Sequence, residues 1–369
     1  MPTLPLQGRV GTTRVSRLYM SIIITDADAE RLLSIPEAIE AMRVAFRDLS
    51  NGKAVNPPRL RYSASTPDPT RRYTANIHAG SVESAGVACV RAGSAFSPVQ
   101  AASGRKVNVA DEVNYTIIIL YDLRTGEPLA FMHETYLSGL RVGATSALAV
   151  SLGAREDASV LGIFGTGMQA VPGCRAICAV RPIRRVQVYS PNPAHRAAFV
   201  ERMAGEKFET IAVDDPREVV RGAHVVACTT NSKVPVLNGE WLEGGQMVIT
   251  IANSDVINAR HEVDETTFAR ASEIIINDWD SVEANRQVEL SGPLVKGLVK
   301  RENVHELGDI VAGKATLKRD PGGIVFYKNN TGLAMQFAAC GAILHRKLLA
   351  EGTNRTIPTE WFAGGKPHI

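Results

Sequence analysis

The sequence of 369 residues contains little cysteine and no paired-cysteine motif. Its five cysteines are odd in number, and none forms a C-x-x-C spacing, which argues against a disulfide framework and a thiolate zinc site. Cys174 and Cys178 lie four residues apart in a segment of helical pattern, with no further metal ligands nearby. We therefore expect these cysteines to be small apolar side chains in a reducing cytoplasm, and we expect no metal site.

Two further absences exclude other functions. No apolar run approaches the roughly 20 residues that a membrane-spanning helix needs. The net charge is only +3 and no basic block occurs, so specific nucleic-acid binding is not expected. With 45% hydrophobic and 21% charged residues, the composition is typical of a globular enzyme large enough for two domains.

The first nineteen residues differ from those that follow. They contain scattered Arg but lack the apolar core of a signal peptide, and a new start, MSIII, follows at Met20. We predict that residues 1–19 form a disordered extension; in the alternative, the start of the chain is mis-assigned and the protein begins at Met20.

Residues 20–135 combine strand patterns with helices. Ser34, Pro36 and Glu37 suit the N-cap, the first turn and the third position of a helix. Strand-type runs follow in RLRYSAS, RRYTANIHAG, GVACVRAGSAF, NYTIIILYDL and PLAFMHE, with a hairpin turn, RTGEP, between the last two. This part of the chain predicts an antiparallel sheet with flanking helices.

From Leu137 onward the pattern changes. An alanine-rich helix, LSGLRVGATSALAVSLGA, leads into alternating strand and helix segments, which indicate a parallel sheet. After about residue 317 a strand, a turn and a long helix complete the chain. The fold class predicted is therefore α/β with a second, α+β part.

The stretch VLGIFGTGMQA (160–170) contains a glycine turn between a strand and a helix. Gly165, Gly167 and Ala170 fit the pattern G-x-G-x-x-A, and a second strand ends at Ser190 at about the expected distance. Gly165 permits the tight turn, Gly167 lets the backbone approach a pyrophosphate, and Ala170 allows close packing of helix and strand. This context predicts a dinucleotide site rather than an ordinary glycine turn.

The segment after that second strand, YSPNPAHR, lacks the acidic residue that usually binds the ribose 2′-hydroxyl of NAD. Ser190, Asn192, His195 and Arg196 could instead receive a 2′-phosphate, which favours NADP. In the alternative, Arg196 is a solvated helix residue and NAD binds without the acid.

Four stretches resemble the ornithine cyclodeaminase/mu-crystallin family: YLSGLRVGATSALAVSLGARED, SVLGIFGTGMQA, HVVACTTNSKVPVL and VFYKNNTGLAMQFAA. The resemblance implies a Rossmann domain (residues 156–317) inserted into a substrate and dimerisation domain built from residues 20–155 and 318–369. It also implies a homodimer and NAD(P)-dependent chemistry on amino acids and imines.

The resemblance further implies three substrate-binding arginines. Arg141 matches the family arginine that binds a substrate carboxylate, a role suited to its planar fork. Arg59 matches a second one, with Arg61 as the competing choice because it would share the strand face. Arg91 is nearest to a lysine of the family; since arginine keeps its proton, we expect Arg91 to bind or polarise the substrate rather than shuttle protons.

Two positions concern catalysis and specificity. Asp255 matches an aspartate near the reacting carbon, which could hold an ammonium or activate water; in the alternative it is a loop cap. Phe337 replaces an acid of the family, which argues against strict ornithine cyclodeamination and favours a longer or acidic substrate. The residues expected to border the cofactor are Gly165, Thr166, Gly167, Met168, Gln169, Ser190, Asn192, Arg196, Thr229 and Asn330.

The function predicted is an NAD(P)-dependent oxidoreductase that moves hydride between the nicotinamide and the carbon of an imine or α-amino acid, with a small carboxylate as substrate. Two alternatives stay open: a cyclodeaminase-type lyase in which the cofactor is not consumed, and a non-enzymatic crystallin-like binder.

Overall fold

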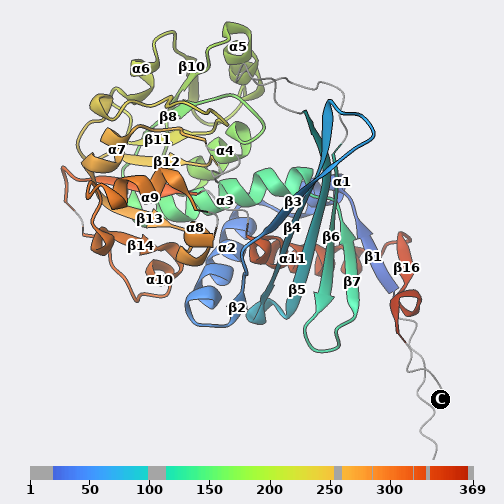
Figure 1. Cartoon of the computed structure of the whole chain (residues 1–369). Coiled ribbons are helices and arrows are strands. Elements are labelled where there is room, and N and C mark those ends of the chain that lie inside the picture. Colours follow the sequence, from blue (N-terminus) through green and yellow to red (C-terminus); the bar gives the residue numbers. More distant parts are fainter. Residues whose placement is uncertain are drawn as a thin grey trace, which may run out of the picture.

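The computed structural model describes residues 20–98, 114–252, 260–284, 286–318, 320–329 and 333–364. They form two lobes, each built around a sheet, as Figure 1 shows. The predicted extension at residues 1–19 lies outside the described residues.

The first sheet has the strand order β16-β1-β7-β6-β5-β4-β2, with β3 paired to β4. Most of its pairs are antiparallel, as predicted, but β1 runs parallel to β7. Its strands are β1 (Met20–Ile24), β2 (Ala54–Val55), β3 (Leu60–Ser65), β4 (Arg71–Val82), β5 (Val87–Pro98), β6 (Tyr115–Asp122), β7 (Pro128–Met132) and β16 (Thr356–Pro358).

Helices from both ends of the chain cover one face of this sheet (Figure 1). They are α1 (Asp26–Leu32), α2 (Ile35–Ser50), α3 (Thr135–Gly153) and α11 (Ala334–Glu351). Ser34 and Glu37 form the predicted capping box of α2. A Cβ at Gly80 would stand 3.0 Å from the Cβ of Ala334, so β4 and the start of α11 approach very closely.

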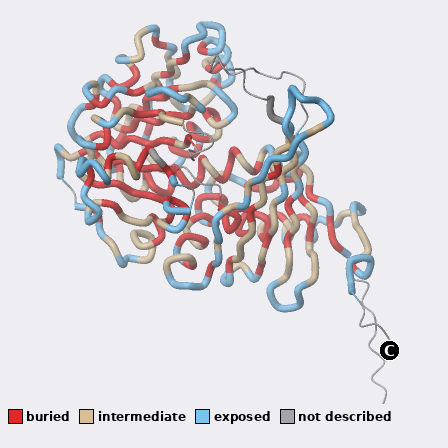
Figure 2. The backbone as a smooth tube through the Cα atoms, in the orientation of Figure 1, coloured by how far each residue is buried: buried red, intermediate tan, exposed pale blue. Residues whose placement is uncertain are grey.

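The second sheet is parallel throughout its described pairs, as predicted, with the order β10-β9-β8-β11-β12-β15-β13-β14. Figure 2 shows how strongly this lobe is buried at its centre. The strands are β8 (Val160–Phe164), β9 (Arg185–Tyr189), β10 (Glu209–Ala212), β11 (Val225–Cys228), β12 (Met247–Thr250), β13 (Ala271–Ile276), β14 (Val304–Glu306) and β15 (Ile324–Lys328). The helices are α4 (Ala170–Val180), α5 (Pro193–Arg202), α6 (Pro216–Val220), α7 (Glu265–Arg270), α8 (Trp279–Ala284), α9 (Val288–Val295) and α10 (Leu307–Val311).

Strand β15 lies inside the second sheet, between β12 and β13. The predicted boundary places residues 318–369 in the other domain, whereas the sheet topology puts β15 in the parallel sheet. The chain returns to the first lobe only after β15, through α11. The run IVFYK is almost wholly buried, which suits a strand covered on both faces.

Helices α3 and α4 join the two lobes. A Cβ at Gly143 would lie 2.7 Å from the backbone oxygen of Pro172, so α3 and α4 touch through their backbones. One apolar core includes Leu120 of the first sheet and Leu161 of the second. The lobes are therefore packed together through these helices.

Candidate active site

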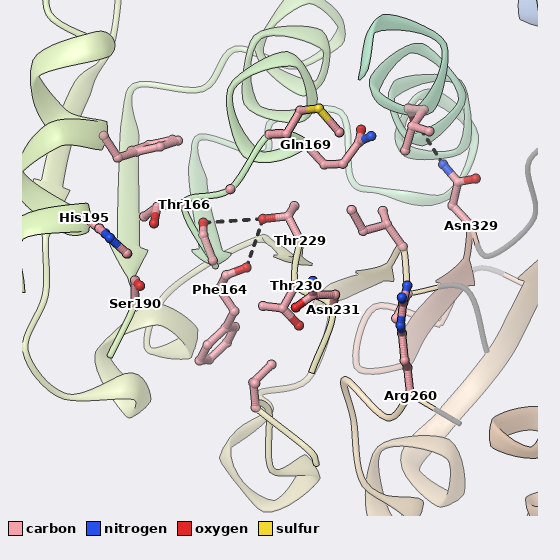
Figure 3. A pocket seen from close by; sticks show the side chains of 18 of the residues that line it. Phe164, Thr166, Gln169, Ser190, His195, Thr229, Thr230, Asn231, Arg260 and Asn329 are labelled. Atoms are coloured by element: carbon pink, nitrogen blue, oxygen red, sulfur yellow. Dashed lines mark hydrogen bonds between the residues drawn. The ribbon is translucent and has the colours of Figure 1, made fainter. Parts of the chain in front are cut away.

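A cavity of about 990 Å³ lies where the two lobes meet. Figure 3 shows its dinucleotide-lobe part: Ser190 and His195 lie toward one side, Thr229 near the middle, and Arg260 and Asn329 toward the other side. Residues of β4, β5 and α3 complete the lining.

The glycine turn after β8 borders the cavity. Gly165 has a φ of +98°, a left-handed conformation that favours glycine, and a Cβ there would stand 2.9 Å from the backbone oxygen of Thr229. A Cβ at Gly167 would meet nothing within 4 Å, so its backbone is open to a ligand. The following helix has no side-chain cap at Gln169. These features suit a bound pyrophosphate.

Thr229 ties β11 to this turn. Its backbone N–H and its hydroxyl both donate to the carbonyl oxygen of Phe164, at 2.8 and 3.0 Å. The bond from the hydroxyl is drawn in Figure 3. Thr229 thus fixes the C-terminal ends of β8 and β11 beside each other at the cavity.

The end of the cavity beside β9 carries no carboxylate among its described lining residues. Ser190, His195 and Arg202 line it, the last two from α5. His195 and Arg202 are exposed on the same side of the helix, seven residues apart. Arg202 was not singled out by the sequence analysis.

Two predicted cofactor residues make other contacts and do not line the cavity. Arg196 is buried; it donates to the carboxylate of Asp214 at 2.5 Å and to the carbonyl oxygen of Ser190 at 2.7 Å. The side-chain oxygen of Asn192 accepts the N–H of Ala194 at 2.9 Å and caps α5. Arg196 therefore supports the loop after β9 from beneath, and it is not the solvated residue of the alternative interpretation.

Glu262 holds the ends of β11 and β12 together beneath the cavity. Its carboxylate is fully buried and accepts the N–H of Thr230 at 2.6 Å, of Ile251 at 2.8 Å and of Ala252 at 2.7 Å. The Thr230 hydroxyl donates to it as well, at 2.8 Å. Burial raises the pKa of Glu262 to about 7, although these hydrogen bonds act to lower it.

The end of β15 is fixed by a buried ion pair and an amide. Lys328 pairs with Glu289, and both side chains are buried. Asn329 donates from Nδ2 to the carbonyl oxygen of Val142 and to the hydroxyl of Ser146, both at 3.0 Å. Asn329 thus connects β15 to the α3 turn that carries Arg141.

Arg141 reaches the cavity from α3 and is only 8% exposed. One guanidinium nitrogen donates to Oε1 of Gln336 at 2.7 Å, and the Phe337 ring lies 4.8 Å from the guanidinium carbon. Its Nε is buried without a hydrogen-bond partner, and no carboxylate pairs with it among the described residues. Burial lowers the pKa of Arg141 to about 10, while the charge of Glu134 opposes that shift.

Arg91 differs from Arg141 because it already has a carboxylate partner. It donates from two nitrogens to the two oxygens of Glu134, and a third nitrogen reaches the carbonyl oxygen of Asn76 at 3.4 Å. This bidentate pair lies at the start of α3, close enough for both charges to act on Arg141. Arg91 still lines the cavity.

A row of polar side chains crosses the first sheet on its cavity side. His78 of β4 stands directly opposite Arg91 of β5. The β3–β4 register, which pairs Leu60 with Ile77, places Arg59 opposite His78 on the other side. Neighbouring strands are about 4.8 Å apart, so the three side chains lie side by side, and all three line the cavity.

The structure therefore gathers most of the predicted site residues around one cavity and leaves others outside it. Arg61, the competing choice to Arg59, does not line it. Asp255 and Asn330 lie outside the described residues. Those that line the cavity are Arg59, Arg91, Arg141, Gly165, Thr166, Gly167, Met168, Gln169, Ser190, His195 and Thr229.

Sequence patterns alone did not indicate His78, Glu134, Arg202 or Glu262 as site residues. The alternation of the strand RRYTANIHAG places His78 and Asn76 on one face, which was a usable signal. Nothing local distinguishes Glu134, because its partner Arg91 lies 43 residues away. Within the described ranges no group of three or more His, Cys, Asp or Glu side chains could hold a metal ion. Nor does that part of the chain contain a helix long and apolar enough to cross a membrane.

Comparison with known proteins decides the family. The model of the ornithine cyclodeaminase/mu-crystallin family matches residues 20–351. The chain belongs to this family. The resemblance inferred from the sequence is therefore confirmed.

Two relatives illustrate the range of proteins that are similar in sequence. An uncharacterized cyclodeaminase of Sinorhizobium fredii is 31% identical over 300 residues, 80% of this chain and 86% of its own length. A Δ1-pyrroline-2-carboxylate reductase of Bacillus cereus is 29% identical over 342 residues, 91% of this chain and 99% of its own length.

Two solved structures share the whole fold. An archaeal alanine dehydrogenase dimer with bound NAD has a TM-score of 0.78 at 25% identity and covers 92% of this chain and 99% of its own. The Δ1-pyrroline-2-carboxylate reductase of Thermococcus litoralis, in complex with NADH and L-proline, has a TM-score of 0.76 at 27% identity and covers 90% and 99%. The predicted α/β fold with a Rossmann domain is confirmed.

Proposed function

We propose that this protein is an NAD(P)-dependent oxidoreductase that interconverts an imine and an α-amino acid. The observation that carries the proposal is the buried guanidinium of Arg141, which has no carboxylate partner among the described residues and faces the cavity that the glycine turn also borders. A buried charge without a counterion is costly, so the site suits an anionic ligand. The named activities of the relatives support the same class of chemistry.

The residues present fit a dinucleotide. Gly165 and Gly167 would cradle the pyrophosphate at the start of α4, Thr229 would border its nicotinamide half, and Ser190 the adenosine ribose. The bound cofactor would supply or accept the hydride. We infer a preference for NADP, which is supported by the lack of a carboxylate after β9 and by Arg202 at that end.

The substrate carboxylate would lie between Arg141 and Arg59. Arg141 can offer its unpartnered Nε, and Phe337 keeps its surroundings apolar, so that the ion pair is formed out of water. We assign Arg91 a polarising role rather than a carboxylate-binding one, since Glu134 already occupies two of its nitrogens. Most of the rate enhancement would come from two effects: the orientation of the imine in the cavity and the electrostatic polarisation of its C=N bond.

We also propose a homodimer that forms through the first sheet, and a reducing compartment such as the cytoplasm. The archaeal alanine dehydrogenase to which the chain is similar is a dimer. All five cysteines are free, which suits a compartment that keeps thiols reduced.

A direct assay tests the proposed function. The purified chain is incubated with Δ1-pyrroline-2-carboxylate and with acyclic α-imino acids in the presence of NADPH or NADH, while the absorbance of the reduced cofactor is followed. We expect imine-dependent oxidation of the cofactor. A parallel incubation with ornithine and NAD measures ammonia, and ammonia release without net change of the cofactor would favour the lyase instead.

A further inference from the structure

We propose that His78 is the proton donor to the substrate nitrogen during imine reduction, and the acceptor of that proton in the reverse direction. This inference rests on the proposed function. It concerns a residue in the middle of β4 for which the sequence analysis assigned no role.

His78 lies in the part of the cavity lined by Arg59, Arg91 and Arg141, which is the proposed substrate end. It is 6% exposed and lines the cavity together with Arg141. Two residues further along β4, Gly80 lies against the start of α11, the helix that carries Phe337. His78 therefore lines the same cavity as Arg141, on the face of β4 that packs against the start of α11.

The neighbouring groups cannot exchange a proton as readily as His78. Arg59, which directly precedes β3, and Arg91 of β5 flank it, and arginine keeps its proton at any ordinary pH. Arg141 from α3 and Arg260 from the second lobe line the same cavity. These arginines stay charged in the same way.

Glu134, the N-cap residue of α3, is the carboxylate next to this group, and it is engaged in the bidentate pair with Arg91. His195, the other histidine of the cavity lining, lies on α5 beside β9, on the side of the cavity away from Arg260 and Asn329 (Figure 3). Among the described lining residues, His78 is thus the histidine at the substrate end.

The chemistry requires such a group. Hydride adds to the carbon of the C=N bond, the π electrons move to nitrogen, and nitrogen takes one proton to become the amine. The imidazolium of His78 gives that proton and is left neutral; solvent restores it before the next turnover. A positioned acid typically contributes about 100-fold or more to the rate. The substrate carboxylate on Arg141 and Arg59 would hold the nitrogen next to the imidazole.

The variants H78Q and H78A test the assignment with Δ1-pyrroline-2-carboxylate and NADPH. We expect kcat to fall about 100-fold in both, while KM for the cofactor changes less than threefold. The limb of the pH profile on which the wild type loses activity as the pH rises should disappear in H78Q. If the limb instead came from ionisation of the substrate, it would remain in H78Q. The pH profile therefore distinguishes ionisation of His78 from ionisation of the substrate. Added imidazole should restore part of the activity of H78A but not of H78Q.

His345→Gln is the matched control, because His345 is a half-buried histidine on α11 near Asp122 and outside the cavity lining. We expect it to keep the wild-type profile. An active wild type with a folded H78Q variant that retains its rate and its pH profile would overturn the inference and leave the proposed function intact. A wild type that reduces none of the imines would overturn both.

Discussion

At the scale of single residues, Arg91 and Arg141 of the cavity lining differ in what balances their charge. Arg91 is neutralised by Glu134, whereas Arg141 is held by an amide and an aromatic ring. An acid in place of Phe337 would stand beside Arg141 and compete with a ligand for it. The apolar ring therefore keeps the charge of Arg141 available to a substrate carboxylate.

This difference gives a first prediction, for Arg141→Lys and Arg141→Ala. Lysine keeps the charge but loses the planar fork, so kcat/KM should fall by about one to two orders of magnitude, since a charged hydrogen-bonded contact contributes about 1.5–3 kcal/mol. Alanine should cost more. Cofactor dissociation constants, measured by calorimetry, should change little. Near-normal efficiency of Arg141→Ala would mean that the carboxylate is held by other residues.

A second prediction concerns cofactor choice. Arg202 lines the cavity beside the end of β9, so Arg202→Ala should raise KM for NADPH about tenfold and leave KM for NADH nearly unchanged, as expected for one lost phosphate contact. The wild type should prefer NADPH by a similar factor.

Arg175→Ala is the control for this experiment. Arg175 is a surface arginine that pairs with Glu206 at 2.7 Å outside the cavity lining. Equal affinities of the wild type for NADPH and NADH would remove the basis of the prediction. Arg196→Ala should behave differently from Arg202→Ala, because Arg196 is buried with Asp214: it should lower the melting temperature and weaken both cofactors alike.

At the scale of elements, the packing of α3 on α4 sets the shape of the site. The third prediction is that Gly143→Ala lowers the midpoint of thermal unfolding by several degrees, because its Cβ would stand 2.7 Å from the backbone oxygen of Pro172 and the helices must separate. Gly173→Ala is the matched control: Gly173 lies within α4, and its Cβ would meet nothing within 4 Å. That change should stabilise by about 0.5–1 kcal/mol. Equal effects of the two variants would contradict the close helix contact.

The fourth prediction concerns the strand ends held by Glu262. Its pKa is raised from 4.5 to about 7 by burial, so the folded state binds a proton that the unfolded state has released. Its contribution to stability is thus fully present below about pH 4.5 and is lost as the pH rises through about 7. We compare the free energy of unfolding of the wild type with that of Glu262→Gln. The wild-type value minus the variant value should fall by roughly 3 kcal/mol between about pH 4.5 and about pH 7.

Urea unfolding at several pH values measures this difference, and other titrating groups cancel in the comparison. A difference that does not change with pH would indicate that the four hydrogen bonds outweigh burial and keep the carboxylate ionised. The free energies of unfolding of the wild type and of Glu262→Gln would then differ by a constant amount. That amount is the cost of placing the NH2 group of glutamine against the N–H groups of Ile251 and Ala252.

Helix α2, the glycine turn after β8 and strand β15 show which features sequence patterns could predict and which they could not. The capping box of α2 and the glycine turn depend on residues within a few positions, and both were predicted. The place of β15 was not, because its neighbours β12 and β13 come from distant segments and an apolar run of five residues suits either sheet. In the same way, Arg196 and Arg91 looked available for ligands until the fold brought Asp214 and Glu134 to them.

At the scale of the whole molecule, the first sheet has two unlike faces. One face packs on α11 and carries His78 and Arg91. The other face bears exposed apolar side chains in adjoining rows: the register places Leu60 and Ile117 in one row and Tyr62 and Tyr115 in the next. Their exposed fractions range from 49% to 69%. An apolar surface of this kind on a folded chain indicates an interface.

The fifth prediction is therefore that the wild type is a homodimer in light scattering at micromolar concentration and that Ile117→Lys converts it to a monomer. Lysine at this position would bury an unpaired charge in the interface and so disfavour association, whereas in the monomer the lysine side chain points into water.

Val295→Lys is the matched control. Val295 is an apolar residue of α9 in the other lobe and is 89% exposed, so this change should leave the dimer intact. Because His78 and Arg91 lie on the opposite face of the same sheet, on β4 and β5, a monomeric Ile117→Lys variant should also lose activity through a loosened sheet while still binding cofactor at the second lobe. A monomeric wild type, or an Ile117→Lys variant that remains a dimer, would show that this face does not form the contact.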